Sequence, residues 1–157
     1  MLEPLKLSKY YAPSVVDFIR TNQHLYFTKD NKRVAVKDLE TLTKLTKECS
    51  FSVMKAEGAI ISGLLFVWVS KNFDSKRQYV KFVYNTPKDL EDLIVYLNWH
   101  VAGEIYCKIS KTSGAIKVLR TKGFHICADR NKEMLLFRAK NTRKFYAPIK
   151  EEDKLDE

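Results

Sequence analysis

Residues 85–97 read NTPKDLEDLIVYL and join a hydrophobic strand at residues 78–84 to an amphipathic helix. Apolar residues recur through this helix at the spacing of one buried face: Leu90, Leu93, Ile94, Leu97 and Val101. In many folds that bind nucleotides or coenzymes, such a junction is a glycine-lined loop that holds a phosphate. This junction contains no glycine, and it carries three carboxylates.

The start of this helix can satisfy its own backbone. Thr86 is suited to cap the helix, Pro87 fits the first helical position, and Asp89 lies three residues after the cap, close to a capping-box arrangement. Asp89, Glu91 and Asp92 also complement the helix dipole. Each acid would repel a unit anionic charge about 5 Å away by roughly 3 kcal/mol at an effective dielectric near 20. We therefore interpret the junction as the remnant of a phosphate site.

The length and composition indicate one domain with a real core. The chain has 157 residues, of which 45% are hydrophobic, and its longest apolar run is too short to span a bilayer. The N-terminus does not have the pattern of a signal peptide. The three cysteines have no spacing typical of a metal site or a disulfide framework, so we expect reduced thiols and no metal.

The net charge of +9 is unevenly placed along the chain. Residues 150–157 read KEEDKLDE and carry −3, which leaves +12 on the other 149 residues. Such a body would attract polyanions, although lysines spread over a solvated surface would give the same total. Both interpretations stay open.

Periodicity and turn residues predict the other elements. In chain order they are a strand at 2–7, helices from about 13 and from 36 separated by the polar turn TKDNKR (28–33), a hairpin at 50–69 that turns at Glu57-Gly58, a strand at 78–84, the helix described above, a strand at 104–110, a helix at 113–123, and closing strands at 124–129 and 133–139. The order β-α-α-β-β-β-α-β-α-β-β is typical of an α/β (α+β) protein with a mixed sheet and helices on both faces.

Residues 112–126, TSGAIKVLRTKGFHI, resemble the fourth-helix signature of the GCN5-related N-acetyltransferase (GNAT) superfamily. In that signature an Asn, an Ala three residues later and a Tyr four residues after that precede a Gly-Phe pair. Ala115, Gly123 and Phe124 match it. Residues 57–69, EGAIISGLLFVWV, resemble the family's third strand, and the element order matches over nearly the whole chain. We expect a GNAT-like domain at residues 1–139, followed at 140–157 by a basic, aromatic arm and an acidic mobile tail.

The resemblance implies acyl-coenzyme A as donor and an amine as acceptor. The family holds the donor's diphosphate on an Arg/Gln-x-x-Gly-x-Gly/Ala loop, and alignment of the strand ends places Lys88 at the basic position. Glu91 and Leu93 replace the two glycines. Side chains there obstruct the close approach of phosphate to backbone. If a coenzyme is retained, Val83, Asn85 and Lys88 are the residues expected to contact it.

The catalytic positions implied by the resemblance are also altered. Leu119 replaces the family Tyr that protonates the departing thiolate, and Thr112 replaces the Asn. Tyr84 and Glu104 are the remaining candidates for a general base, and a phenol is a poor base near neutral pH. Cys107 lies mid-strand near the expected acyl channel, where an inert buried thiol is the simplest interpretation.

Two groups of cations are candidates for polyanion binding. Lys117, Arg120 and Lys122 fall on the fourth helix, and Lys140, Arg143 and Lys144 precede two aromatic residues in the arm. A solvated helix face and a docked arm would account for the same pattern.

Three functions remain open. The first is a GNAT-fold protein with a degenerate acyl-CoA site that needs no cofactor and acts as a binding or structural module with a protein partner, for example in a phage or other viral assembly. The second is an active N-acetyltransferase that uses acetyl-CoA in a divergent donor site. The third is a nucleic-acid-binding protein. We favour the first, and expect it in the cytoplasm, or in the virion if viral, without membrane association.

Overall fold

The computed structural model describes residues 1–22, 25–29, 32–70, 77–129 and 133–138. The predicted arm at 140–157, including Lys140, Arg143 and Lys144, lies outside the described residues. In the described part of the chain, no helix is long and apolar enough to cross a membrane.

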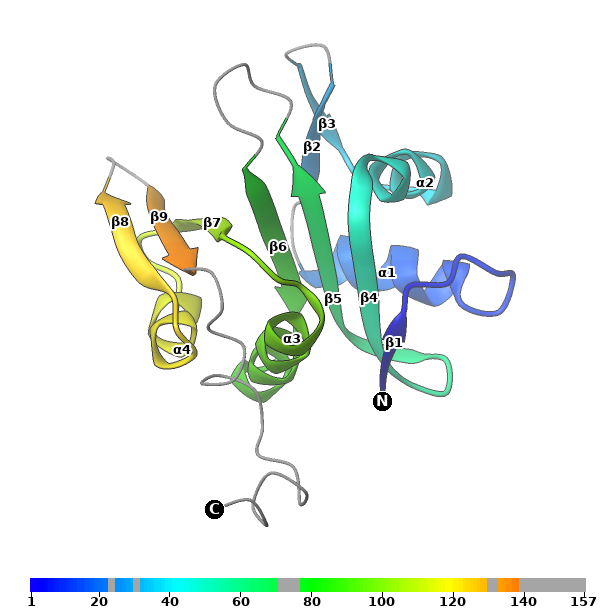
Figure 1. The fold of residues 1–157 in the computed structure, drawn as a ribbon. Coiled ribbons are helices and arrows are strands. Elements are labelled where there is room, and N and C mark those ends of the chain that lie inside the picture. The colour runs from blue at the N-terminus through cyan, green and yellow to red at the C-terminus, as the bar shows by residue number, and fades with distance from the viewer. Residues whose placement is uncertain (23–24, 30–31, 71–76, 130–132, 139–157) are drawn as a thin grey trace.

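A mixed sheet of seven strands forms the centre of the molecule, in the order β1-β4-β5-β6-β7-β9-β8 (Figure 1). The strands are β1 (Leu2–Pro4), β4 (Cys49–Glu57), β5 (Ile60–Val69), β6 (Gln78–Tyr84), β7 (Ile105–Ser110), β8 (His125–Asp129) and β9 (Glu133–Arg138). The pairing of β6 with β7 is parallel, and every other pairing in this sheet is antiparallel.

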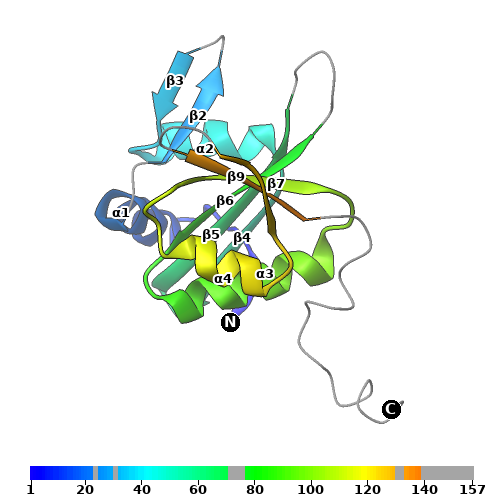
Figure 2. The same ribbon diagram turned by 90° about the vertical axis from the view of Figure 1, so that its left-hand side faces the viewer.

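Helices cover both faces of this sheet (Figure 2). They are α1 (Ala12–Asn22), α2 (Leu39–Glu48), α3 (Pro87–His100) and α4 (Ala115–Thr121). Helices α3 and α4 pack on one face, where Leu93 and Leu119 belong to one apolar core, while α1 and α2 pack on the other face around Leu42 and Phe66. The predicted α/β class, the mixed sheet and the helices on both faces are confirmed.

One predicted turn is wrong. Residues 28–33 were predicted as a polar turn between two helices, but the described residues on both sides of 30–31 belong to two paired antiparallel strands, β2 (Tyr26–Lys29) and β3 (Lys32–Ala35). Val36, predicted to begin the second helix, instead closes this pair of strands through its N–H to the carbonyl of Leu25 at 2.7 Å. The helix begins later because Asp38 caps it, accepting from the Thr41 N–H at 2.9 Å.

Gly63 brings α3 close to the sheet. A Cβ at this position of β5 would lie 2.9 Å from Leu93 Cδ1, so a larger residue would push the helix outward. The distance between α3 and the sheet, and hence the position of the helix start, depends on this glycine.

A buried arginine fixes the other end of α3. Arg138 on β9 donates to Asn98 Oδ1 at 2.9 Å and to the carbonyl oxygens of Val101 and Gly103 at 2.7 and 2.8 Å. These groups lie at the C-terminus of α3 and just beyond it, where a cation is favoured by the helix dipole. Burial lowers the pKa of Arg138 to about 10, so the guanidinium stays charged at neutral pH.

Candidate functional site

Strands β6 and β7 run side by side for a short distance and then separate. Their ladder joins Gln78 to Ile105 and Tyr79 to Tyr106, although the strands are seven and six residues long. The Gln78 side chain anchors this paired end by donating from Nε2 to the carbonyls of Ala102 and Glu104 at 3.0 and 3.2 Å. Beyond this paired end the two strands have no further ladder pairs and leave an opening between them.

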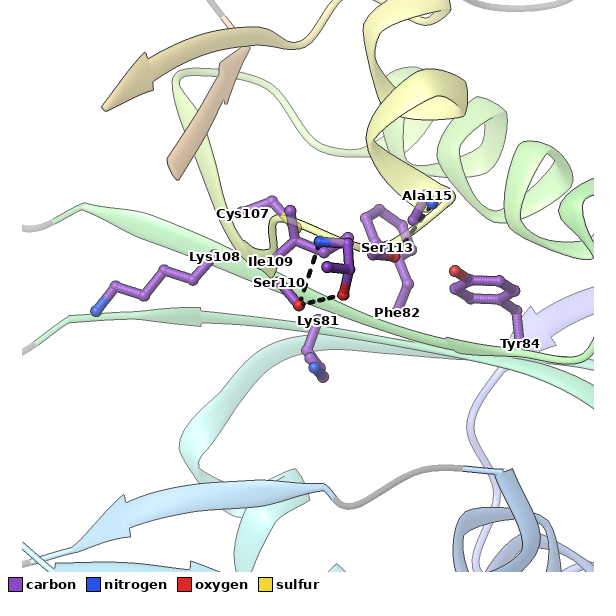
Figure 3. A pocket seen from close by; sticks show the side chains of 10 residues that line it. Lys81, Phe82, Tyr84, Cys107, Lys108, Ile109, Ser110, Ser113 and Ala115 are labelled. Atoms are coloured by element: carbon purple, nitrogen blue, oxygen red, sulfur yellow. Dashed lines mark hydrogen bonds between the residues drawn. The ribbon is translucent and has the colours of Figure 1, made fainter. Parts of the chain in front are cut away.

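A cavity of about 380 Å³ occupies this opening. Its walls come from the second half of β6, the second half of β7 and the residues that lead into α4 (Figure 3). Phe82, Cys107 and Ala115 supply apolar surface. At the entry to α4, the hydroxyls of Ser110 and Thr112 lie 3.1 Å apart and can exchange their mutual hydrogen bond for one to a ligand.

The cavity has different chemistry on the two faces of the sheet. Side chains alternate along a strand, so Phe82 and Tyr84 point toward α3 and α4 while Lys81 points to the opposite face (Figure 3). Lys108 lies one residue after the buried Cys107 and shares the face of Lys81. The lining is therefore apolar on the side of α3 and α4, and the opposite side, with Lys81 and Lys108, forms what we call the cationic mouth.

The start of α3 forms a complete capping box, as the sequence predicts. Asp89 N–H donates to Thr86 Oγ1 at 3.2 Å, and Asp89 Oδ2 accepts from Thr86 N–H at 3.1 Å. Pro87 has no N–H, and the Leu90 N–H goes to the Thr86 carbonyl. This leaves the Lys88 amide as the first-turn N–H for which the described residues supply no acceptor. Few backbone N–H groups at the start of α3 therefore remain available to bind a diphosphate.

The predicted electrostatic repulsion at this helix start needs correction. Lys55 Nζ on β4 lies 2.6 Å from Asp89 Oδ1 and 2.9 Å from Asp92 Oδ2. Lys88 also pairs with Asp92, at 3.2 Å, and Lys122, the residue after α4, pairs with Glu91, at 3.4 Å. Three carboxylates thus face three ammonium groups, and Asp89 is buried. An anion near the helix meets a neutral cluster, so the estimate of roughly 3 kcal/mol per acid does not apply.

These contacts shift the acids toward their charged forms. Partial burial alone raises the pKa of Asp89, but hydrogen bonds from Lys55 and Thr86 outweigh it and the pKa lies below the usual 3.8. Partial burial likewise raises the pKa of Asp92, and the hydrogen bonds from Lys55 and Lys88 bring it below 3.8. Asp89 and Asp92 are therefore ionised at neutral pH.

The predicted catalytic and cofactor residues separate in space. Tyr84 lines the cavity, whereas Glu104 is exposed at the paired end of the two strands and is not part of the lining. Leu119 is fully buried in the core. Val83 is buried on the face of α1 and α2, and its side chain does not line the cavity.

Asn85 and Lys88 are exposed beside the start of α3, and their contact with a coenzyme remains a prediction. Cys107 is buried in the lining, and burial raises the pKa of its thiol to about 12, as expected for an unreactive cysteine. Lys117 and Arg120 are exposed on α4, and polyanion binding by these residues also remains a prediction.

Sequence reasoning missed the residues that define the cationic mouth. Lys81 and Lys108 come from different strands, and their proximity depends on the parallel pairing of β6 with β7. The available signal was the alternation of these lysines with buried Val80, Phe82 and Cys107. It places each lysine on the face of the sheet opposite to the core under α3 and α4. Lys55 was missed for the same reason, since its partners lie more than thirty residues away.

Comparison with known proteins identifies the fold. No protein-family model matches the sequence, and no curated protein matches it. A spermidine N-acetyltransferase from Vibrio cholerae is similar in structure, with a TM-score of 0.64 at 10% identity over 91% of this chain and 96% of that one. A ribosomal-protein-alanine N-acetyltransferase from Brucella melitensis has a TM-score of 0.60 at 12% identity, covering 87% of this chain and 96% of that one.

A third structure contains a ligand. A Salmonella typhimurium protein solved with its cofactor acetyl-CoA has a TM-score of 0.56 at 11% identity, over 87% of this chain and 90% of that one. Structural similarity at such low sequence identity establishes the fold of the chain but does not establish its chemical activity. The element order, the parallel pairing of two strands that then separate, and these similarities together show that the chain has the fold of the GCN5-related N-acetyltransferase superfamily.

Proposed function

We propose that this protein is an acyl-coenzyme A-dependent N-acyltransferase whose donor binds between β6 and β7. The observation that carries the proposal is the cavity of about 380 Å³ where the two strands separate. The pantetheine arm of coenzyme A is a linear amide chain, and separated strand edges offer backbone N–H and C=O groups to such a chain. The neighbour with acetyl-CoA bound supports the same choice of donor.

The residues of the cavity favour orientation of the reactants over proton transfer. Coenzyme A supplies the activated thioester. Ser110 and Thr112 are placed to hydrogen-bond the donor, while Phe82 and Ala115 exclude water from the apolar side. No carboxylate is among the described lining residues. Tyr84 is a poor base near neutral pH, so on this proposal the acceptor amine arrives uncharged or loses its proton to water.

This chemistry sets the pH dependence. Below the pKa of the acceptor amine, the uncharged fraction grows about tenfold per pH unit, and the rate of transfer at fixed acceptor concentration should grow with it. A rate that levels off well below the amine's pKa would show that a protein group removes the proton.

A second candidate is a binding module with a degenerate donor site. The capping box at the start of α3 favours it, because that box occupies backbone amides that a diphosphate would otherwise use. The first candidate requires lysine side chains such as Lys88 to replace those amides. Lys88 is free to do so in part, since its side chain is largely exposed and its one ion pair is with Asp92.

Calorimetry with acetyl-CoA separates the two candidates. Thr112→Trp places a large ring in the cavity at an exposed position, and we expect it to weaken binding by at least roughly tenfold. Thr121→Trp makes the same change at an exposed site of α4 outside the lining, and binding should stay within about twofold. Equal affinities for the two variants would contradict the placement of the donor.

Transfer is measured separately, by mass spectrometry of peptide and polyamine acceptors incubated with acetyl-CoA. Micromolar binding with acetylated product supports the enzyme. The absence of binding at millimolar acetyl-CoA, or binding without product on any acceptor, supports the module.

A further inference from the structure

A row of aromatic side chains crosses the sheet beside the cationic mouth. Trp68, Tyr79, Tyr106 and Phe137 come from β5, β6, β7 and β9, and each is the direct cross-strand partner of the next. Successive ring centroids lie 6.0, 5.9 and 5.0 Å apart. Their chain neighbours, among them Val80, point into the core beneath α3 and α4, so the row lies on the opposite face.

Three cations lie along this row. Lys81 and Lys108 follow Tyr79 and Tyr106 by two residues and therefore share their face. Lys108 Nζ lies 5.3 Å from the centroid of the Tyr79 ring, and the Arg77 guanidinium lies 4.5 Å from that of Tyr106. Cation–π contacts of this kind position the charges without neutralising them.

The cations have no acidic partner among the described residues. None of the described ion pairs involves Arg77, Lys81 or Lys108. The described acid on β8, Asp129, is paired with Lys111. Near the start of α3, by contrast, every lysine of the cluster faces a carboxylate. Among the described side chains, the positive charges of this face beside the cavity are therefore not balanced by paired carboxylates.

The arrangement of the rings decides which anion fits. Single-stranded nucleic acid binds sheet surfaces by stacking its bases on exposed ring faces. Here Lys108 lies over the ring of Tyr79 and Arg77 lies over the ring of Tyr106, at ring faces on which a base would stack. Ring edges carry partial positive charge. Edges together with ammonium and guanidinium groups suit carboxylates.

We propose that this face, defined by Trp68, Tyr79, Tyr106, Phe137, Arg77, Lys81 and Lys108, binds an acidic peptide segment whose N-terminal amine enters the cationic mouth. The role of that amine as acceptor rests on the proposed function, whereas the binding of the peptide does not. The acidic side chains pair with Lys81, Lys108 and Arg77, and the amine reaches the cavity between β6 and β7.

Fluorescence anisotropy tests the surface directly. The probe is a ten-residue peptide with a free N-terminal alanine, four glutamates directly after it and a C-terminal dye, compared with a peptide in which glutamines replace the glutamates. We expect the acidic peptide to bind at least about tenfold more tightly. Equal affinities would overturn the proposal.

Paired variants locate the binding site. Lys81→Gln with Lys108→Gln should weaken the acidic peptide by about tenfold or more, and Lys81→Arg with Lys108→Arg should keep its affinity within about threefold. The control removes the same charge from two exposed lysines after β1, at the other edge of the sheet, through Lys6→Gln with Lys9→Gln, and should change the affinity by less than about twofold. Equal loss in the two glutamine pairs would show that net charge alone attracts the peptide, and would overturn the proposal.

Two further outcomes separate this inference from the proposed function. A decamer of thymidylate that binds as tightly as the acidic peptide would identify a general polyanion surface and overturn the choice of a peptide. If the acidic peptide binds at this face but is never acetylated, the surface stands and the transferase fails. If the glutamine peptide is acetylated as fast as the acidic one, the transferase stands and the acidic preference fails.

Discussion

Replacement of Lys55 by methionine tests the ionic cluster that holds α3 against the sheet. Lys55 Nζ lies 2.6 Å from Asp89 and 2.9 Å from Asp92, and the three side chains retain 19%, 12% and 28% of their exposure. In Lys55→Met, Asp89 keeps the hydrogen bonds from Thr86 and Asp92 keeps its pairing with Lys88, but the cluster acquires a net charge of −1.

The expected cost lies between two limits. Exposed ion pairs contribute about 0–1 kcal/mol, whereas breaking a fully buried pair costs about 3–5 kcal/mol. A bridge that is mostly but not fully buried should contribute about 2–3 kcal/mol, which for a domain of this size lowers Tm by about 5–10 °C. Urea unfolding at pH 7 measures the free energy.

The pH dependence distinguishes charge from packing. In the folded wild-type protein the pKa values of Asp89 and Asp92 lie below 3.8, so their contribution to stability is fully present above pH 3.8 and is lost as the pH falls through the folded-state values. The difference between wild type and Lys55→Met should therefore be largest near neutral pH and shrink below pH 3.8.

The matched control is Lys44→Met, which breaks the exposed pair with Glu40 at 3.2 Å. This change should cost less than about 0.5 kcal/mol. If Lys55→Met costs no more than Lys44→Met, or if its cost is the same at pH 7 and pH 3, the cluster does not stabilise α3 by charge pairing.

Three other changes probe packing, a buried charge and thiol access. Arg138→Met should lower the free energy of unfolding by about 2–4 kcal/mol, because it leaves buried acceptors unpaired; urea unfolding that shows a loss below about 1 kcal/mol would contradict this. Gly63→Ala should cost about 1–3 kcal/mol in the same assay, since its Cβ would press on Leu93, and no loss would mean that α3 shifts freely. In the native state, maleimide should label the exposed Cys127 within minutes and leave the buried Cys107, whose pKa is about 12, unlabelled until unfolding, with peptide mass mapping as the readout; native labelling of Cys107 would show that the cavity admits the reagent.

Local signals made most of the fold predictable. The alternation and apolar content of residues 78–84 predicted β6 with its observed bounds, and Thr86-Pro87 with Asp89 predicted the start of α3 and its capping box. Gly123, with φ of 99°, and the buried Phe124 occupy the turn after α4 that the family signature implied. In each case the residues within the element or next to it determine where the element begins or ends.

The hairpin of β2 and β3 had no such signal. Its strands are four residues long, and lysines occupy both positions next to the turn, as in many surface loops. The pairing of two short strands sets a register, such as Phe27 opposite Val34, that the linear pattern does not reveal.

The candidate site was only partly predictable. Tyr84, a candidate general base from the sequence, lines the cavity, and its catalytic role stays a prediction. The charge state of the helix start was not predicted correctly, because the lysines that neutralise Asp89 and Glu91 come from β4 and from the residue after α4. A carboxylate count along one segment overestimates repulsion when folding brings distant cations to it.

The short ladder between β6 and β7 has a mechanical consequence. Backbone hydrogen bonds tie β1, β4, β5 and β6 into one plate and β7, β9 and β8 into another, and two residue pairs at one end join the plates. A small tilt between the plates stretches side-chain packing under α3 and α4 and breaks few ladder bonds. We therefore expect the joined end to act as a hinge, and the two plates to move apart or together more easily than either plate deforms within itself.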